Sequence, residues 1–379
     1  MTKAFFGAGQ IAEREIQSGN IPTVIFDNNP ELHGQAFMKL PVLEPSRESL
    51  ANIDQLLICS SSISEITEQC HELGMDRTKI VVSDYLGDFA KAHRLESYKF
   101  DGYISCGLPS QKSVLKGGGV FHVSERDDGT LEIEKIFEAN THGCVRYDNE
   151  LVFSAQGYGI VILDLDSGQV KQVIQLESGL RPHGVQRNKD GYFVTCSLDD
   201  SVKHFNSDGS LVRTYRLSDK KISRKSAQHH CNDLWVTDHS IFVSMFSLSG
   251  CWKLGVFDGG VAEVDRVNGE ITHVIHDLSM PHNVTLRDER LYVLDSFHGR
   301  ILGHNQQCLG TLNGFARGLA FDSDYILIGE SKNRNATKML RGAHLASLDS
   351  RITIVDASAG ICRSISLPKE ISEIHAVTV

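Results

Sequence analysis

The chain has 379 residues, of which 41% are hydrophobic, and its formal net charge is -10. This length exceeds one ordinary domain and supplies enough apolar residues for two cores. The negative charge argues against a general nucleic-acid binder, because such proteins need a basic face that releases counterions from phosphates. We therefore expect a multidomain protein with no nucleic-acid partner.

The N-terminal stretch MTKAFFGAGQ lacks the apolar core of a signal peptide, and no run in the chain approaches the roughly 18 apolar residues that span a bilayer. The nine cysteines form no C-x-x-C pair, and most lie in apolar runs such as LLICS and YFVTC. Reduced, buried thiols behave there as small hydrophobic side chains. These features predict a cytoplasmic protein with no membrane partner and with neither a disulfide framework nor a zinc ribbon.

Residues 1–98 begin in the order strand, glycine turn, helix. An apolar, β-prone run precedes the pattern G-x-G-x-x-A, whose glycines are Gly7 and Gly9, and a helix is expected from Gln10. A second strand ends at Asp27, and the runs QLLICSSS and KIVVSD predict two further parallel strands. This order predicts a small α/β Rossmann-like domain.

Gly7, Gly9 and Asp27 are the candidate cofactor-binding residues of this domain. The glycines allow a tight turn, and the helix N-terminus offers N–H groups to a phosphate. An acidic residue at the end of the second strand, here Asp27, can accept hydrogen bonds from ribose hydroxyls. The alternative is that the glycines only let helix and strand pack closely. The stretch FDNNPELHGQAFMKLPVLEPS resembles the N-terminal domain of PglD-type sugar O-acyltransferases, over about residues 3–85. That resemblance implies a nucleotide or nucleotide-sugar pocket at the three positions.

Residues 99–379 change to short β-rich runs separated by Asp-Gly, Asn-Gly and Ser-Gly turns, which is typical of an all-β domain. Five units share an anchor strand, which reads LVFSA, YFVTC, IFVSM, LYVLD and ILIGE. Their spacing fits four-stranded propeller blades. The C-terminal run IHAVTV supplies a first strand to DGYISCG, GGVFHVS and LEIEKIF. We therefore predict a six-bladed β-propeller closed by pairing of its N- and C-terminal strands.

One position recurs nine residues ahead of each anchor strand. Its occupants in the five units and in the shared blade are, in order, His142, His183, Asn232, His282, Arg317 and His375. The first strand of each blade lines the central channel, so these side chains are expected to form a ring around the axis. His229 or His230, just upstream of Asn232, can also reach it.

Two sets of motifs carry resemblances to known propellers. RPHG at Arg181 and MPHN at Met280 resemble the steps that open inner strands in virginiamycin B lyase and NHL-type propellers. HHCNDLWV, SMPHNVTLRDERLYVLDS and GVAEVDRVNGE resemble an uncharacterised bacterial propeller family, over most of residues 115–379. These resemblances imply a six-bladed propeller and bring no established reaction.

Neutral imidazoles that converge on an axis suit a divalent transition metal, with zinc, iron, manganese and nickel all compatible. The candidate metal ligands are His142, His183, His230, His282 and His375. The candidate catalytic residues are Arg317, Asp295 and Glu330. The arginine can bind an anionic group of a substrate. Asp295, Glu330 and Ser105 lie near the ends of second strands, where they can act as general bases or orient other groups. The alternative is structural, with each histidine only bonding a neighbouring blade.

Two classes of function follow. The first is a metal-dependent lyase, hydrolase or epimerase that acts in the channel on a small carbohydrate or nucleotide-sugar. The second is a non-catalytic binding or assembly module whose Rossmann-like domain senses a nucleotide. A channel lined by imidazoles favours the first, and a channel filled by apolar side chains favours the second. An NAD-dependent oxidoreductase is less favoured, because the α/β part stops after about four strands.

Two minor expectations concern other residues. Arg334, Lys338 and Arg341, in a long insertion of the fifth unit, are candidates for phosphate contacts. Trp235 and Trp252 are expected to pack between or within blades.

Overall fold

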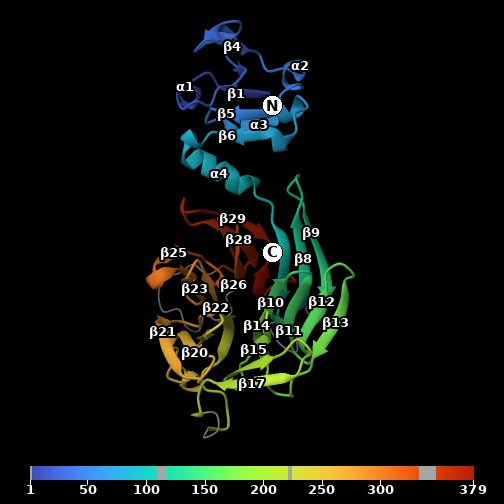
Figure 1. Cartoon of the computed structure of the whole chain (residues 1–379), viewed down its shortest axis with the longest axis vertical. Helices are drawn as coiled ribbons and strands as arrows, with labels where there is room; N and C mark the ends of the chain where they lie inside the picture. Colours follow the sequence, from blue (N-terminus) through green and yellow to red (C-terminus); the bar gives the residue numbers. More distant parts are fainter. Residues whose placement is uncertain (1, 109–116, 221–223, 333–346) are drawn as a thin grey trace. The chain divides into compact units, whose positions relative to one another are not determined.

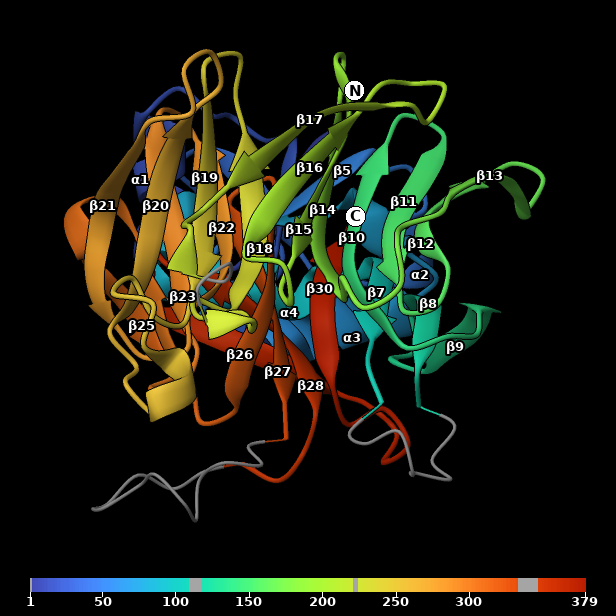
Figure 2. The ribbon, with the colours of Figure 1, turned by 90° about the horizontal axis from the view of Figure 1, so that it is seen from below.

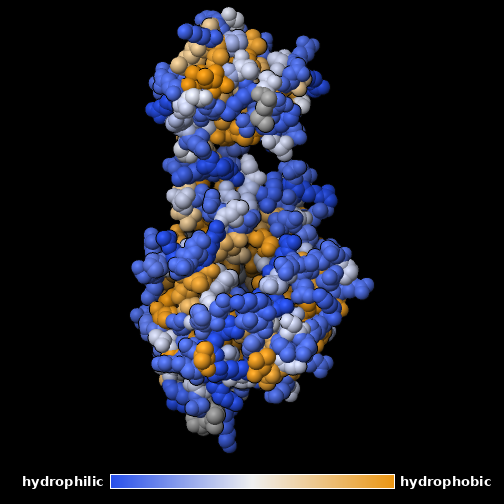
Figure 3. Space-filling view, in the orientation of Figure 1, coloured by the Kyte–Doolittle hydropathy of each residue, from blue (hydrophilic) through white to orange (hydrophobic). Residues whose placement is uncertain are grey.

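The computed structural model describes residues 2–108, 117–220, 224–332 and 347–379. The chain divides into two compact units, Met1–Tyr98 and Lys99–Val379 (Figure 1). In the view of Figure 3 the surface of each unit is mostly hydrophilic, with scattered apolar patches. Among the described residues, no helix is both long and apolar enough to cross a membrane.

The first unit is a six-stranded sheet in the order β3-β4-β2-β1-β5-β6, parallel except for the β3–β4 pair. Its strands are β1 Lys3–Phe6, β2 Val24–Phe26, β3 Ala36–Phe37, β4 Leu40–Leu43, β5 Gln55–Ile58 and β6 Ile80–Val82. Its helices are α1 Gln10–Gln17, α2 Arg47–Leu50, α3 Ile63–Glu72 and α4 Asp88–Ser97, with 3-10 turns η1 Pro30–Leu32, η2 Arg77–Lys79 and η3 Asp84–Leu86. The predicted α/β sheet is confirmed. It has two more strands than expected, the short antiparallel pair β3–β4 at one edge of the sheet.

The central strands of this sheet are buried on both faces, which explains their unbroken apolar runs. Phe5 and Ile25 belong to one apolar cluster, and Phe6 and Phe26 belong to another. Successive side chains of a strand point to opposite faces, so each strand contributes to both layers.

The second unit consists of six four-stranded antiparallel sheets. Five are contiguous in sequence: β10 Thr141–Tyr147, β11 Glu150–Ala155, β12 Gly159–Asp164 and β13 Gln169–Ile174; β14 Pro182–Asn188, β15 Gly191–Cys196, β16 Ser201–Phe205 and β17 Leu211–Arg216; β18 Cys231–Val236, β19 Ser240–Met245, β20 Gly259–Asp265 and β21 Ile271–Leu278; β22 His282–Arg287, β23 Arg290–Asp295, β24 Arg300–Leu302 and β25 Cys308–Thr311; β26 Phe315–Asp322, β27 Tyr325–Ser331, β28 Arg351–Asp356 and β29 Ile361–Ser366. Short 3-10 turns lie at η4 Trp252–Leu254 and η5 His304–Gln306. Figure 2 shows inner strands such as β14, β18 and β30 near the centre, with β13 and β21 at the periphery.

The sixth blade has the order β30-β7-β8-β9 and closes the ring, as predicted. Its strands are β7 Asp101–Cys106, β8 Gly119–Glu125, β9 Leu131–Phe137 and β30 Ile374–Thr378. The antiparallel pairing of β30 with β7 brings the red and cyan ends of the propeller together in Figure 1. Arg363 on β29 forms a 2.6 Å ion pair with Glu125 on β8, so the fifth blade is also tied to the shared one.

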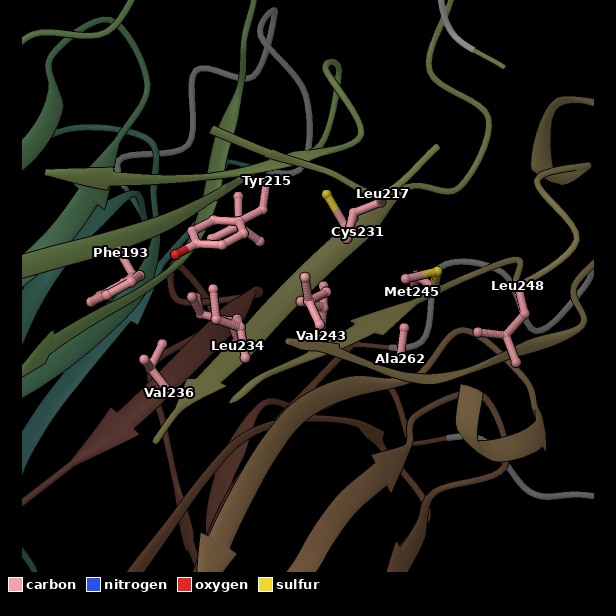
Figure 4. Close-up of a cluster of buried hydrophobic side chains, with 13 residues drawn as sticks. Phe193, Tyr215, Leu217, Cys231, Leu234, Val236, Val243, Met245, Leu248 and Ala262 are labelled. Carbon is pink, nitrogen blue, oxygen red and sulfur yellow. The ribbon is translucent and has the colours of Figure 1, made fainter. Parts of the chain in front are cut away.

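Blades pack face to face through buried apolar side chains. One such cluster joins Phe193 and Tyr215 of the β14–β17 blade to Leu234, Val243 and Met245 of the β18–β21 blade (Figure 4). Full burial of a large apolar side chain contributes about 1.5–3 kcal/mol. Similar clusters fill other blade interfaces, so the blades hold the inner strands rigidly around the axis.

Candidate functional site

Each of the six inner strands breaks its regular pairing at the position where the repeat predicts a ring residue. The register shifts between Thr141 and Cys144 in β10, and a comparable shift occurs in each of the other five inner strands. The side chains within or at the edge of these bulges are His142, His183, Asn232, His282, Arg317 and His375. A bulge bends its strand and re-aims a side chain. The ring residues thereby leave the ordinary in–out alternation, a feature that the sequence did not reveal.

These bulges surround a cavity of about 870 Å³ at one end of the inner strands. Five imidazoles line it, from His142, His183, His230, His282 and His375. Arg181, Arg317 and Glu373 supply charge to the same wall, while Phe246, Trp252, Phe257, Met280 and Phe315 form an apolar wall. This volume falls in the range of small-molecule pockets, and the mixed lining is typical of them.

The imidazoles lie close to one another. The ring centroid of His142 is 4.2 Å from that of His183 and 4.4 Å from that of His375, and His183 is 5.6 Å from His230. Asn232 takes a different place, because its amide donates to the carbonyl of Pro281 at 3.0 Å and its side chain is absent from the cavity wall. Four of the six ring positions and His230 therefore bring histidines to one cavity, with Arg317 beside them.

The buried imidazoles are held neutral. Burial lowers the pKa of His142, His183 and His282 well below its ordinary value, and neighbouring imidazoles and Arg317 or Arg181 lower it further. Burial lowers the pKa of His230 to about 3, with the same two arginines contributing. A neutral imidazole has one N–H donor and one lone pair, so each ring can accept a proton or bind a ligand.

Several of these rings have nitrogen atoms that bond nothing in the described part of the chain. They are Nδ1 of His142, Nε2 of His183 and Nδ1 of His230. His282 differs, because its Nδ1 lies 2.9 Å from the carbonyl of Met280 and 2.9 Å from the hydroxyl of Ser296, which fixes the ring. A buried polar atom without a partner costs about 1–3 kcal/mol. These three nitrogen atoms are themselves buried, so a ligand in the cavity reaches them only after the rings rotate.

Arg317, Glu373 and His375 form a charged group in the cavity. Arg317 Nη1 lies 3.5 Å from Nε2 of His375 and 4.0 Å from Oε2 of Glu373. The same Glu373 oxygen lies 3.7 Å from His375 Nε2, and the guanidinium lies over the ring of Phe315 at 4.6 Å. Glu373 is 3% exposed and was not predicted. In the sequence, Glu373 is marked only by its position two residues before His375, just ahead of the last strand.

A hydroxyl on the second strand of one blade fixes the ring residue of the next. Ser105 donates to the carbonyl oxygen of His142, Ser154 does the same for His183, and Thr195 donates to the carbonyl of Asn232 at 2.6 Å. The predicted orienting role of Ser105 thus corresponds to a contact with the backbone of His142, and the same device recurs in two other blades.

Asp295 and Glu330 lie outside the cavity wall and hold structural partners. Asp295 accepts from the N–H of Ser279 and pairs with Arg300, while Glu330 accepts from the N–H of Gly314 at 2.7 Å and pairs with Arg351 at 2.8 Å. Each carboxylate fixes the connection that leads into an inner strand. The end of a second strand therefore carries a buried acid for backbone contacts, and the sequence alone could not distinguish this role from catalysis.

Comparison with known proteins gives a family for the propeller. A family model described as a domain of unknown function (DUF4915) matches residues 133–379. The chain belongs to this family. No curated protein matches the chain.

Solved structures show the fold of this DUF4915 propeller and nothing further. A chain of a nidogen/laminin complex aligns with a TM-score of 0.52 at 12% identity, over 74% of this chain and 98% of that one. A protein of unknown function from Bacteroides caccae aligns with a TM-score of 0.50 at 12% identity, over 73% and 98%. Virginiamycin B lyase from Staphylococcus aureus aligns at 12% identity over 71% and 88%, with a TM-score of 0.42 that supports no functional argument.

The DUF4915 match does not include the α/β unit, and the resemblance to PglD-type acyltransferases finds no support. In this unit the Asp27 carboxylate accepts from the N–H of Ala8 at 2.7 Å, inside the glycine turn. Gly7 has φ of +102° and lies against the backbone of Cys59, which fits the packing alternative. A Cβ at Gly9 would meet nothing within 4 Å, so packing does not require that glycine. A nucleotide at Gly7, Gly9 and Asp27 stays a prediction.

Two further expectations concern the DUF4915 domain. Trp252, expected to pack between or within blades, lines the cavity and lies 4.4 Å from His230 between ring centroids. Arg334, Lys338 and Arg341 lie outside the described residues.

The chemistry of the donor set fits a transition metal, while the side-chain arrangement does not yet form a metal site. Neutral, buried imidazole nitrogens without partners are the ligands that such metals prefer. In the described part of the chain, however, no three or more His, Cys, Asp or Glu side chains are grouped to hold an ion. The predicted metal at His142, His183, His230, His282 and His375 therefore requires rotation of imidazole side chains and stays a prediction.

Proposed function

We propose that the cavity around the histidine ring is the reaction centre of an enzyme, a lyase, hydrolase or epimerase that acts on a small anionic carbohydrate. One observation carries this proposal: buried, neutral imidazoles share one 870 Å³ cavity with Arg317 and Glu373, and three of their nitrogens have no partner among the described residues. Maintaining so many buried polar atoms at the axis is costly for a scaffold. Imidazole is also the side chain that most often transfers protons in general acid–base catalysis.

The residues divide the chemistry between them. Arg317 binds the anionic group, because its planar guanidinium matches a carboxylate or phosphate and Phe315 holds it in place. His142 and His183 face the cavity as neutral bases that take or return a proton on the bound substrate. Glu373 lies beside His375 and stabilises the charge that this imidazole gains when it receives a proton.

The apolar wall determines which substrates fit. Phe246 and Trp252 each lie 4.4 Å from His230 between ring centroids, and all three rings line the cavity. Aromatic faces bind the C–H face of a sugar while the opposite polar wall bonds its hydroxyls. A sugar acid or sugar phosphate combines both properties, and a nucleotide-sugar is a larger member of the same class.

A divalent metal is a separable part of the proposal. If His142, His183 and His375 hold zinc, iron, manganese or nickel, these imidazoles would be ligands in place of bases, and the ion would supply a Lewis acid that polarises a substrate oxygen. Element analysis of the purified protein before and after chelation tests this part. A stoichiometric metal that is lost in the double variant H142A/H183A supports it, and metal-free protein with unchanged turnover removes it.

The alternative is a binding module without catalysis. A channel filled by apolar side chains would favour that alternative, whereas this cavity is open and is lined by imidazoles along one wall. The apolar wall supports ligand binding by an enzyme and by a binding module alike, so turnover is the quantity that separates the two.

The test is a screen of sugar acids and sugar phosphates, followed by NMR for turnover and by Trp252 fluorescence for binding. We expect turnover of at least one acid, loss of turnover in H183A and H282A, and no loss in H276A, which removes an exposed histidine on β21. Binding without turnover across the panel would favour the module. If the protein neither binds nor turns over any compound of the panel, the proposal is contradicted.

A further inference from the structure

The channel continues past the histidine ring into a second pocket. This second pocket has a volume of about 300 Å³ and is lined by residues further along the inner strands, among them Val185, Trp235, Leu286 and Phe321. Between the cavity and the second pocket lies a throat of about 10 Å³, which is roughly the space of one water molecule. The two spaces are therefore separate sites on one axis.

The throat is narrow because small residues follow most of the ring positions and let the backbones of the inner strands approach one another closely. Four of the six are small: Gly143, Gly184, Gly318 and Ala376. A Cβ at Gly143 would lie 2.5 Å from the nitrogen of Val185, and a Cβ at Gly184 would lie 2.2 Å from Oδ1 of Asp233. The inner strands are thus packed backbone to backbone, and only Asp233 and Asn283 have functional side chains in this layer.

Asn283 has a fixed orientation that defines the state of Asp233. Its Oδ1 accepts from the N–H of Gly318 at 2.6 Å, so its amide NH₂ must point the other way. That NH₂ donates to Oδ2 of Asp233, while Oδ1 of Asp233 accepts from the N–H of Leu234 at 2.9 Å. Both carboxylate oxygens are therefore acceptors, and each has a lone pair remaining.

Asp233 is a carboxylate with no cation beside it. It forms no ion pair with any described Lys, Arg or His, and Arg287, the other charged residue of the pocket wall, is held elsewhere. The Arg287 guanidinium donates to the carbonyl of Ser323 at 2.5 Å and lies 4.7 Å from the centre of the Phe321 ring. Burial raises the pKa of Asp233 to about 7, as expected for a carboxylate that lacks a positive partner.

We propose that the second pocket binds a small organic amine, whose ammonium group pairs with Asp233 and whose apolar body contacts Trp235, Leu286 and Phe321. The wall supports this ligand class, because it is mostly apolar and offers one partly buried carboxylate. An anion is disfavoured by the same carboxylate, and a purely apolar molecule leaves it without a cation. A volume of 300 Å³ suits a ligand with one aromatic ring and a short chain. This site is independent of the reaction proposed for the histidine ring.

The test compares three probes of similar shape on the full chain by calorimetry at pH 8: 2-phenylethylamine, 2-phenylethanol and 3-phenylpropionate. We expect the amine to bind at least tenfold more tightly than the alcohol and the acid to bind most weakly. The variant D233N should remove the preference for the amine. D324N, which changes an exposed aspartate between β26 and β27 in the same way, should preserve it.

Two further measurements keep the result interpretable. E373Q removes the buried carboxylate of the first cavity, so retention of amine binding in that variant places the amine in the second pocket. Because D233N sets two amide groups face to face and can weaken folding, the comparison of amine and alcohol on the unaltered protein and on E373Q is the second test. Equal affinity for amine and alcohol, or a preference that survives in D233N, would overturn the proposal.

Discussion

The propeller should lose stability steeply as the pH falls below neutral. His142, His183, His230 and His282 are neutral in the folded protein because burial lowers their pKa. In the unfolded chain each returns to a pKa near 6.5 and takes up a proton. Their pKa in the folded state lies below their pKa in the unfolded chain. The free energy of unfolding is therefore highest above pH 6.5 and decreases as the pH falls below that value.

The magnitude follows from the proton balance. One such histidine lowers the free energy of unfolding by roughly 1 kcal/mol between pH 7 and pH 5.5, and four lower it by roughly 4–5 kcal/mol. Asp233 acts in the opposite direction, because its pKa of about 7 makes the folded state the better proton acceptor. It restores roughly 1–2 kcal/mol over this range. The net loss of about 3 kcal/mol is a large part of the 5–15 kcal/mol typical of a domain.

The assay is urea unfolding at pH 5.5, 6.0, 6.5 and 7.0 in the presence of a chelator, which prevents a metal from masking the imidazoles. The two tryptophans, Trp235 and Trp252, both belong to the propeller, so their fluorescence reports this unit alone. H183Q should reduce the loss of stability between pH 7 and pH 5.5 by roughly 1 kcal/mol, the contribution of one histidine. H276Q, which removes an exposed imidazole, should leave it unchanged. D233N should make the dependence steeper.

One result would refute this reasoning. If the free energy of unfolding is the same at pH 5.5 and pH 7, the imidazoles of the cavity are not neutral in the folded state. A chain that becomes more stable toward pH 5.5 would lead to the same conclusion.

Three other outcomes can be measured with single variants. R317Q should weaken binding of a sugar acid at least tenfold in fluorescence titrations while leaving its neutral sugar counterpart within twofold, and equal losses for both would contradict anion recognition. G184A should cost about 1–3 kcal/mol in urea unfolding, because its Cβ overlaps Asp233, whereas G310A, whose Cβ makes only an ordinary contact of 3.6 Å in the same unit, should change it by less than about 1 kcal/mol. E330Q should cost about 3–5 kcal/mol by leaving the guanidinium of Arg351 without its buried partner, and a neutral result would mean that the pair is dispensable.

The sequence predicted the architecture well because repetition carries the information. Anchor strands at regular spacing indicated the blades, and the lone run IHAVTV indicated how the ring closes. Identity at one repeat position also located most of the cavity histidines, since equivalent residues of a propeller lie at equal depth. The number of blades and the ring of equivalent residues follow from the internal repeat, so one sequence is enough to predict them.

The parts that were missed depend on contacts between segments without any repeat. Glu373 reaches the cavity from the approach to the last strand, and Trp252 from a connection between β19 and β20. Conversely, Asp295 and Glu330 sit at the ends of second strands, as candidate bases would, but their oxygens are engaged by arginines and backbone N–H groups. Which partner a buried acid finds depends on packing, and no local pattern records it.

The shared blade also has a consequence for how the protein is made. The strand β30 that completes it ends at Thr378, whereas its partner β7 begins at Asp101. A ribosome therefore releases five blades before the residues that close the circle have left the exit tunnel. Until then the edge of β7 remains open to other strands, so newly synthesised chains at high concentration are the form most prone to pair with one another.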